Sequence, residues 1–128
     1  MNDKAVLARG RRARREVLGA DQKVHEDRFS EPFREFTTRY VWGEIWTRKG
    51  LPRKTRCLVN IALLTAMRCT DGLKMHIRGA RKNGCTEEEI REVLMQAAVY
   101  CGVPVVRAAV NCASEVFASE PVRRRKSS

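Results

Sequence analysis

The sequence predicts an all-helical protein, built as one compact helical bundle with a long amino-terminal helical arm. Its apolar residues recur at intervals of three and four along every periodic segment, and none of these segments alternates as a strand would. The length of 128 residues suits one domain, and 43% hydrophobic residues can form a real core. We therefore expect a single domain over residues 1–128, with a basic helical arm and linker over 1–28 and a basic flexible tail over 119–128.

The amino-terminal part contains two predicted helices. Residues 4–18 form a basic amphipathic helix that ends near Gly19. Residues 31–48 form the second helix, for which Ser30 is a suitable N-cap and Pro32 fits the first turn.

The next two predicted helices lie in the middle of the chain. Pro52 can open a helix over about 53–68, which is apolar on nearly every face through its middle. We expect this helix to be the central, buried one. A shorter helix over 71–82 ends where cationic residues are followed by Asn83-Gly84.

The last two helices begin at clear local signals. Thr86 and Glu89, three residues apart, match a capping box and predict a helix start. Pro104 opens the final helix, whose many small residues suit close packing. Two such apolar helices on so short a chain expose more apolar surface than a monomer usually keeps, so we expect a homo-oligomer.

The net charge of +11 lies mainly at the two ends of the chain. Residues 1–15 carry six basic side chains and residues 123–126 carry four, whereas residues 16–122 hold 16 basic against 14 acidic side chains. Basic ends leave open a nucleic-acid-binding module. The near-neutral body argues against it, and the ends can equally be subunit contacts or solvated tails, so we expect no nucleic-acid partner.

Five cysteines, an odd number with no Cys-x-x-Cys pair, argue against a disulfide framework and against a zinc site. No apolar run is long enough to cross a membrane, and the amino terminus lacks the apolar core of a signal peptide. We expect a reduced, cytoplasmic protein with no membrane partner and no metal.

His76 is the first candidate for chemistry, because it lies on the apolar stripe of the predicted helix over 71–82. The alternative is a core histidine bonded to a backbone carbonyl, which position alone favours. Arg53, Lys54 and Arg56 open the preceding helix and can either bind an anionic substrate or face water.

An aromatic segment supplies the second group of candidates. Arg39, Trp42 and Trp46 are spaced three and four residues apart and so share a helical face. Glu44 lies off that face; a carboxyl group among aromatic rings is favoured in its protonated form and can exchange a proton. Alternatively, the tryptophans pack the core and Glu44 pairs with Arg48.

At these residues the chain resembles the carboxymuconolactone decarboxylase family, within the alkylhydroperoxidase-D-like superfamily. The resemblance runs in order over roughly residues 10–118. Its specific motifs are the Trp-Gly-Glu-x-Trp-Thr-Arg run that starts at Trp42 and the Tyr-Cys-Gly-Val-Pro run that starts at Tyr100. Shorter matches cover residues 15–19, 36–41, 53–56, 73–78, 83–84 and 88–94.

The resemblance implies an all-helical bundle that assembles into a ring of identical subunits, such as a hexamer. It also implies cofactor-free decarboxylation of 4-carboxymuconolactone, a dicarboxylate lactone, to the enol-lactone of 3-oxoadipate in protocatechuate catabolism. From the chemistry of that step we expect Arg39 or Arg56 to bind a carboxylate, the two tryptophans to wall the pocket, and His76 with Glu44 to be catalytic.

Some positions depart from the family pattern and leave alternatives open. Gly72 stands where a glutamate is usual, and Arg107 and Asn111 stand where asparagine and histidine are expected, so a divergent relative could act on another lactone or acid. A thiol-dependent hydroperoxidase needs Cys-x-x-Cys-x-x-x-His. Here Cys69 and His76 fit that motif but Gly72 replaces the second thiol, which disfavours this activity.

Overall fold

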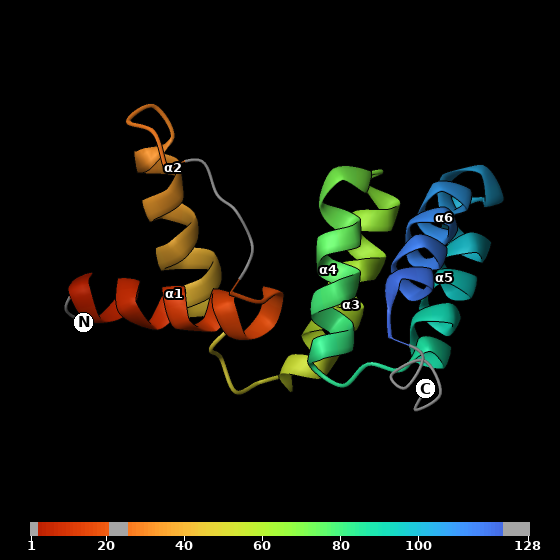
Figure 1. Cartoon of the computed structure of the whole chain (residues 1–128), viewed down its shortest axis with the longest axis horizontal. Helices are drawn as coiled ribbons and strands as arrows, with labels where there is room; N and C mark the ends of the chain where they lie inside the picture. Colours follow the sequence, from red (N-terminus) through yellow and green to blue (C-terminus); the bar gives the residue numbers. More distant parts are fainter. Residues whose placement is uncertain (1–2, 21–25, 122–128) are drawn as a thin grey trace. The chain divides into compact units, whose positions relative to one another are not determined.

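The computed structural model describes residues 3–20 and 26–121, and these residues form helices and no strand (Figure 1). The all-helical prediction is thus confirmed for this part of the chain. The elements in order are α1 (Asp3–Leu18), α2 (Glu31–Phe36), the π-helix η1 (Thr37–Ile45), α3 (Arg53–Ala66), α4 (Thr70–Lys82), α5 (Glu87–Cys101) and α6 (Val103–Ser119).

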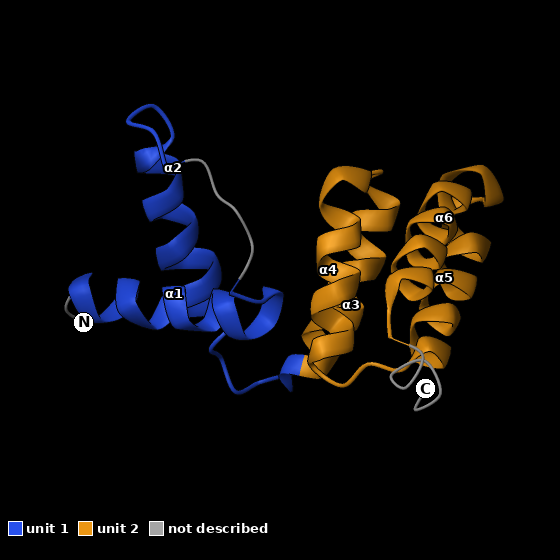
Figure 2. Cartoon of the chain, viewed as in Figure 1, with its two compact units in different colours: residues 1–53 blue, residues 54–128 orange. Residues whose placement is uncertain are grey.

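The chain divides into two compact units, Met1–Arg53 and Lys54–Ser128 (Figure 2). Unit 1 holds α1, α2 and η1, and unit 2 holds α3 to α6. The single domain over 1–128 stays a prediction. Most of the predicted tail over 119–128 and part of the predicted linker lie outside the described residues.

Unit 1 depends on a close crossing of α1 and η1 (Figure 1). A Cβ atom added at Gly10 of α1 would lie 2.0 Å from the backbone oxygen of Thr38, and one added at Gly43 would lie 2.9 Å from the backbone oxygen of Val6. The Arg9 side chain fastens the crossing, because its Nε donates a 2.8 Å hydrogen bond to the Gly43 carbonyl. The two backbones therefore meet with no room for a side chain between them.

The helix predicted over 31–48 is present from Glu31 to Ile45, but it changes type along its length. Six α-helical residues are followed by a nine-residue π-helix, and at its end the Trp46 amide donates to the Val41 carbonyl, five residues back, at 2.9 Å. Thr38 and Gly43, also five residues apart, both contact α1. Packing against α1 thus accounts for the wider turn, and hydrophobic periodicity carries no sign of it.

Ser30 occupies the predicted N-cap position of α2, but its side chain makes no capping bond. Its hydroxyl instead donates to the Asp27 carbonyl at 3.4 Å and accepts from Arg34 at 2.6 Å. Pro32 lies in the first turn as predicted.

In unit 2, α6 packs against α4 and α5. The core includes side chains that are fully buried, among them Ile61, Leu73, Ile77 and Ile90. Helix α3, which was expected to be the central, buried helix, is not fully buried within unit 2. Val59, Leu63 and Met67 leave an apolar stripe open, and Leu63 is 53% exposed. The other helices of unit 2 cover one side of α3, but the apolar residues of α3 continue onto the side that they leave open.

Local signals set the ends of α4 and α5 as predicted. Gly84 has φ of +94° just after α4, a conformation that favours glycine. The capping box forms in full, because the Glu89 amide donates to Thr86 Oγ1 at 3.0 Å and the Thr86 amide donates to the Glu89 carboxylate at 2.8 Å. The Thr86 amide, followed by the Lys54 side chain, lowers the pKa of Glu89.

A buried ion pair joins the end of α4 to the residue that follows α6. Arg81 Nε lies 2.7 Å from one carboxylate oxygen of Glu120, and Arg81 Nη2 lies 3.1 Å from the other. Both side chains are less than 10% exposed. Arg81 also donates to the Cys85 carbonyl and lies over the Phe117 ring. This two-pronged contact fixes the carboxyl end of α6 against α4.

We predict that Gly10→Ala lowers the free energy of unfolding of unit 1 by about 1–3 kcal/mol or more, because the new methyl group overlaps the Thr38 carbonyl. Fluorescence-detected urea unfolding suits the test, since both tryptophans, Trp42 and Trp46, lie in this unit. Gly50→Ala is the matched control: a Cβ there meets nothing within 4 Å, so the change should stay within roughly 1 kcal/mol. Equal stability of the Gly10→Ala variant and the parent would contradict the close crossing.

Candidate functional site

The six site residues predicted from sequence fall into both units. Arg39, Trp42, Glu44 and Trp46 belong to unit 1, whereas Arg56 and His76 belong to unit 2. Each group is therefore described within its own unit.

The two tryptophans form a buried, stacked pair. Their ring centroids are 5.2 Å apart with 25° between the ring planes, and the residues are 7% and 8% exposed. Trp42 lies in η1 and Trp46 directly follows it, so the wide turn sets this geometry. They pack the core of unit 1, as the alternative interpretation expected, and their role as pocket walls stays a prediction.

Arg39 and Glu44 lie closer to solvent than the tryptophans. The Arg39 guanidinium pairs with the carboxylate of Asp3 in α1 and lies 5.7 Å from the centre of the Tyr40 ring. The hydrogen bond to Asp3 raises the pKa of Arg39. Glu44 is exposed. The expected enclosure of its carboxyl group by aromatic rings is therefore wrong within unit 1.

His76, on α4, is half-buried and is held by a side chain that the sequence analysis did not select. Asn60 of α3 places its Nδ2 2.9 Å from His76 Nδ1. This contact is made with a side-chain amide. Asn60 could have been selected from the sequence, because a polar residue within the apolar middle of a helix needs a hydrogen-bond partner when it is buried.

Two further residues lie one helical turn before this pair, one on α3 and one on α4. Arg56 precedes Asn60 by four residues on α3, so the two side chains share a helical face. Gly72 precedes His76 by one turn of α4, and a Cβ added there would lie 4.0 Å from His76 Cδ2. Helices α3 and α4 thus carry a guanidinium, an amide and an imidazole, and Gly72, which has no side chain, lies next to the imidazole.

The other basic residues at the start of α3 are engaged in ion pairs. Arg53 lies 2.9 Å from a carboxylate oxygen of Glu16, within unit 1. Lys54 lies 3.0 Å from Glu89, within unit 2. These two cations therefore serve structure in their own units.

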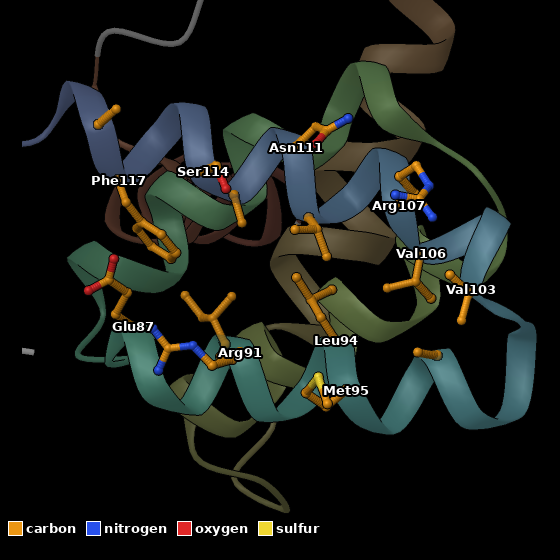
Figure 3. Close-up of a pocket in the computed structure, with 15 residues that line it drawn as sticks. Glu87, Arg91, Leu94, Met95, Val103, Val106, Arg107, Asn111, Ser114 and Phe117 are labelled. Atoms are coloured by element: carbon orange, nitrogen blue, oxygen red, sulfur yellow. The ribbon is translucent and has the colours of Figure 1, made fainter.

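A groove of about 690 Å³ lies between α5 and α6 in unit 2 (Figure 3). Apolar side chains dominate its walls, including Leu94, Val106 and Phe117, while Arg107 and Asn111 add polar groups. None of the six predicted site residues lines it. The two departures from the family pattern on the last helix thus share one groove.

The thiols and acidic groups of the described residues form no metal cluster. All five cysteines are free. A hydrogen bond from the Cys57 thiol lowers the pKa of Cys85, while burial acts in the opposite direction. No helix among residues 3–20 and 26–121 is long and apolar enough to cross a membrane.

Comparison with known proteins places the chain in a family. The model of the carboxymuconolactone decarboxylase family matches residues 31–115. The chain belongs to the carboxymuconolactone decarboxylase family. The resemblance drawn from the Trp42 and Tyr100 motifs is thereby confirmed.

Three relatives show the range of this family. The chain is 41% identical to 4-carboxymuconolactone decarboxylase of Acinetobacter baylyi, over 91% of this chain and 90% of that protein. It is also 41% identical to nitrosuccinic acid decarboxylase of Metarhizium robertsii, over 74% of this chain and 69% of that protein. An uncharacterised 15.0 kDa protein of Paracoccus denitrificans is 34% identical over 62% of each chain. By their names, the first two relatives decarboxylate different acids.

Proposed function

We propose that this protein is a carboxy-lyase that converts 4-carboxymuconolactone to the enol-lactone of 3-oxoadipate with release of carbon dioxide. The observation that carries the proposal is the 41% identity to the Acinetobacter baylyi enzyme of that name, which extends over nine-tenths of both chains. The family match over residues 31–115 supports the same activity.

The chemistry of this substrate explains why the reaction needs no cofactor. The departing carboxylate lies gamma to the unsaturated lactone carbonyl. When its carbon–carbon bond breaks, the electron pair moves through the ring onto the carbonyl oxygen and forms a dienolate. The protein must then bind a dicarboxylate, stabilise the dienolate oxygen and add a proton to the carbon alpha to the carbonyl.

We assign the catalytic roles to His76 and Glu44, because the reaction requires a hydrogen-bond donor for the dienolate oxygen and a proton for carbon. The half-buried position of His76 and its fixed contact with Asn60 support this assignment. Arg56 is the preferred partner for a substrate carboxylate, because it shares a face of α3 with Asn60. Arg39 is the second candidate for that role, and its guanidinium already pairs with Asp3.

Trp42 and Trp46 are proposed as an apolar wall that desolvates the departing carboxylate. Their stacked arrangement supports a rigid surface. Contact with substrate would involve the edges that remain exposed, because little of either residue reaches solvent.

We also propose that the chain works as a homo-oligomer, such as a ring, in the cytoplasm. Exposed aromatic residues at and along α2 support self-association: Phe29 is 96% exposed, Phe33 68% and Phe36 56%. Five free thiols suit a reducing compartment. The near-neutral charge of residues 16–122 supports a small-molecule substrate over nucleic acid.

A second candidate is decarboxylation of a different small acid. The Metarhizium robertsii relative, with the same identity over a shorter stretch, favours it. Arg107 and Asn111, which line the groove between α5 and α6, are the residues that would distinguish such a substrate.

We predict that the purified protein releases carbon dioxide from 4-carboxymuconolactone without added metal or organic cofactor, at a rate that EDTA leaves unchanged. The reason is that the substrate supplies its own electron sink. Carbon dioxide release should be followed in parallel with nitrosuccinate as substrate. Turnover of nitrosuccinate alone would favour the second candidate, and loss of activity on chelation, restored by a divalent ion, would contradict the cofactor-free mechanism.

We predict that His76→Ala lowers kcat by roughly two to four orders of magnitude, the usual size of an acid–base or oxyanion contribution. Glu44→Gln should also slow turnover, because it removes a proton donor. Circular dichroism must first show that both variants keep their helices. The other histidine of the chain provides a control, since His25→Ala should retain the parental rate. A folded His76→Ala variant with near-parental turnover would make His76 a packing residue.

Light scattering tests the oligomer. We predict a mass several times that of one chain for the parent and a shift toward the monomer for Phe33→Asp, because the charge disrupts an apolar contact. Lys49→Asp, also exposed in unit 1, is the control and should assemble as the parent does. A monomeric parent at assay concentration would contradict self-association.

A further inference from the structure

We propose that Asn60 is a positioning residue that holds His76 as the neutral tautomer with its proton on Nε2, so that His76 stabilises the dienolate oxygen as a hydrogen-bond donor. This inference rests on the proposed function, in which His76 takes part in the reaction. Its physical basis is the 2.9 Å contact between Asn60 Nδ2 and His76 Nδ1 across α3 and α4.

The chemistry of the amide determines the tautomer. The Nδ2 atom of an asparagine carries two hydrogens and can only donate, whereas a ring nitrogen of histidine accepts only when it carries no proton. A hydrogen bond from Asn60 Nδ2 to His76 Nδ1 therefore requires an unprotonated Nδ1. The proton of the neutral ring then has to lie on Nε2.

The same contact disfavours the imidazolium form of His76. Addition of a second proton to the ring would place an N–H group on Nδ1, facing the N–H groups of Asn60 at 2.9 Å. Two donors at that distance cannot form a hydrogen bond, so the amide would have to rotate before the ring could take up the proton. The amide contact therefore stabilises a neutral imidazole.

A neutral imidazole suits one of the two catalytic tasks better than the other. Its Nε2–H group is a good hydrogen-bond donor to a developing oxyanion, as oxyanion stabilisation requires, but it is too weak an acid to give up the proton. The carbon alpha to the carbonyl must then be protonated by another acid.

Asn60 has the surroundings that a positioning residue needs. Asn60 is half-buried on α3, where the next residue, Ile61, is fully buried and the flanking residues Cys57 and Thr65 are also buried. On the side of α4, Ile77 directly follows His76 and is fully buried. Both partners are thus carried by helices that the core of unit 2 fixes, which holds the amide and the ring in register.

The test is nitrogen NMR of the resting, full-length protein labelled with 15N at histidine. His25→Gln assigns the two histidines, since the chain has no others. The chemical shifts of the two ring nitrogens distinguish a protonated nitrogen from an unprotonated one. We expect His76 near neutral pH to show a proton on Nε2 and none on Nδ1. The opposite tautomer, or a charged ring, would overturn the proposal.

Two variants of Asn60 test the cause. Asn60→Asp presents only acceptors, so we expect a proton to move to Nδ1 and kcat to fall by roughly 100-fold or more, as when a catalytic histidine is held in the wrong tautomer. Asn60→Ala should give a mixture of tautomers and a smaller fall in kcat with KM little changed. Asn83→Ala is the matched control. It also removes an amide donor from the region of α4, a 2.8 Å bond to the Gly79 carbonyl, and should leave the tautomer of His76 unchanged.

The outcomes separate this inference from the proposed function. An Nε2–H tautomer that is unaffected by Asn60→Asp or Asn60→Ala shows that Asn60 does not set it, and the proposal fails. Parental kcat in a folded Asn60→Asp variant whose tautomer has changed also overturns it. A protein that shows the expected tautomers but does not decarboxylate either acid refutes the proposed function, since the NMR measurement needs no substrate.

Discussion

Each of the two units carries more apolar surface than its own helices cover, and much of the structure follows from this constraint. Each unit buries one set of faces, with α1 against η1 in unit 1 and α6 against α4 and α5 in unit 2. What remains is the open stripe of α3 that includes Leu63, the aromatic residues at α2 and the groove between α5 and α6. All three surfaces are apolar, so their exposure to water is unfavourable. A second molecule, whether substrate or subunit, lowers the free energy of the system by covering them.

Local chemistry in the sequence was sufficient to predict most helix ends. Gly84 and the Thr86 capping box act within a few residues, so their effect can be read without knowledge of the fold. The π-helix could not be predicted in this way, because it depends on the contact of Thr38 with Gly10, which are 28 positions apart in the sequence. The exposure of α3 was missed for a similar reason: an apolar face shows that a helix can be buried and does not show what covers it.

The candidate site shows the same division. Residue type and helical position identified His76, but the role of a histidine depends on what its second nitrogen contacts, and that partner lies on another helix. Asn60 was visible only as a polar interruption in an apolar segment. The environment of Glu44 was judged from neighbours in the sequence, whereas in the structure the tryptophans turn into the core and leave the carboxylate in solvent. Spacing along one helix cannot distinguish these cases.

The pairing of Arg81 with Glu120 also defines where the folded chain can be cut or extended. A protein shortened to end before Glu120 would keep every helix but leave the Arg81 guanidinium buried without its carboxylate, a loss that costs about 3–5 kcal/mol in comparable pairs. A fusion partner joined after residue 121 would leave this pair intact. An engineered version of unit 2 should therefore extend at least to Glu120, whose carboxylate pairs with Arg81, and should not stop at the last turn of α6.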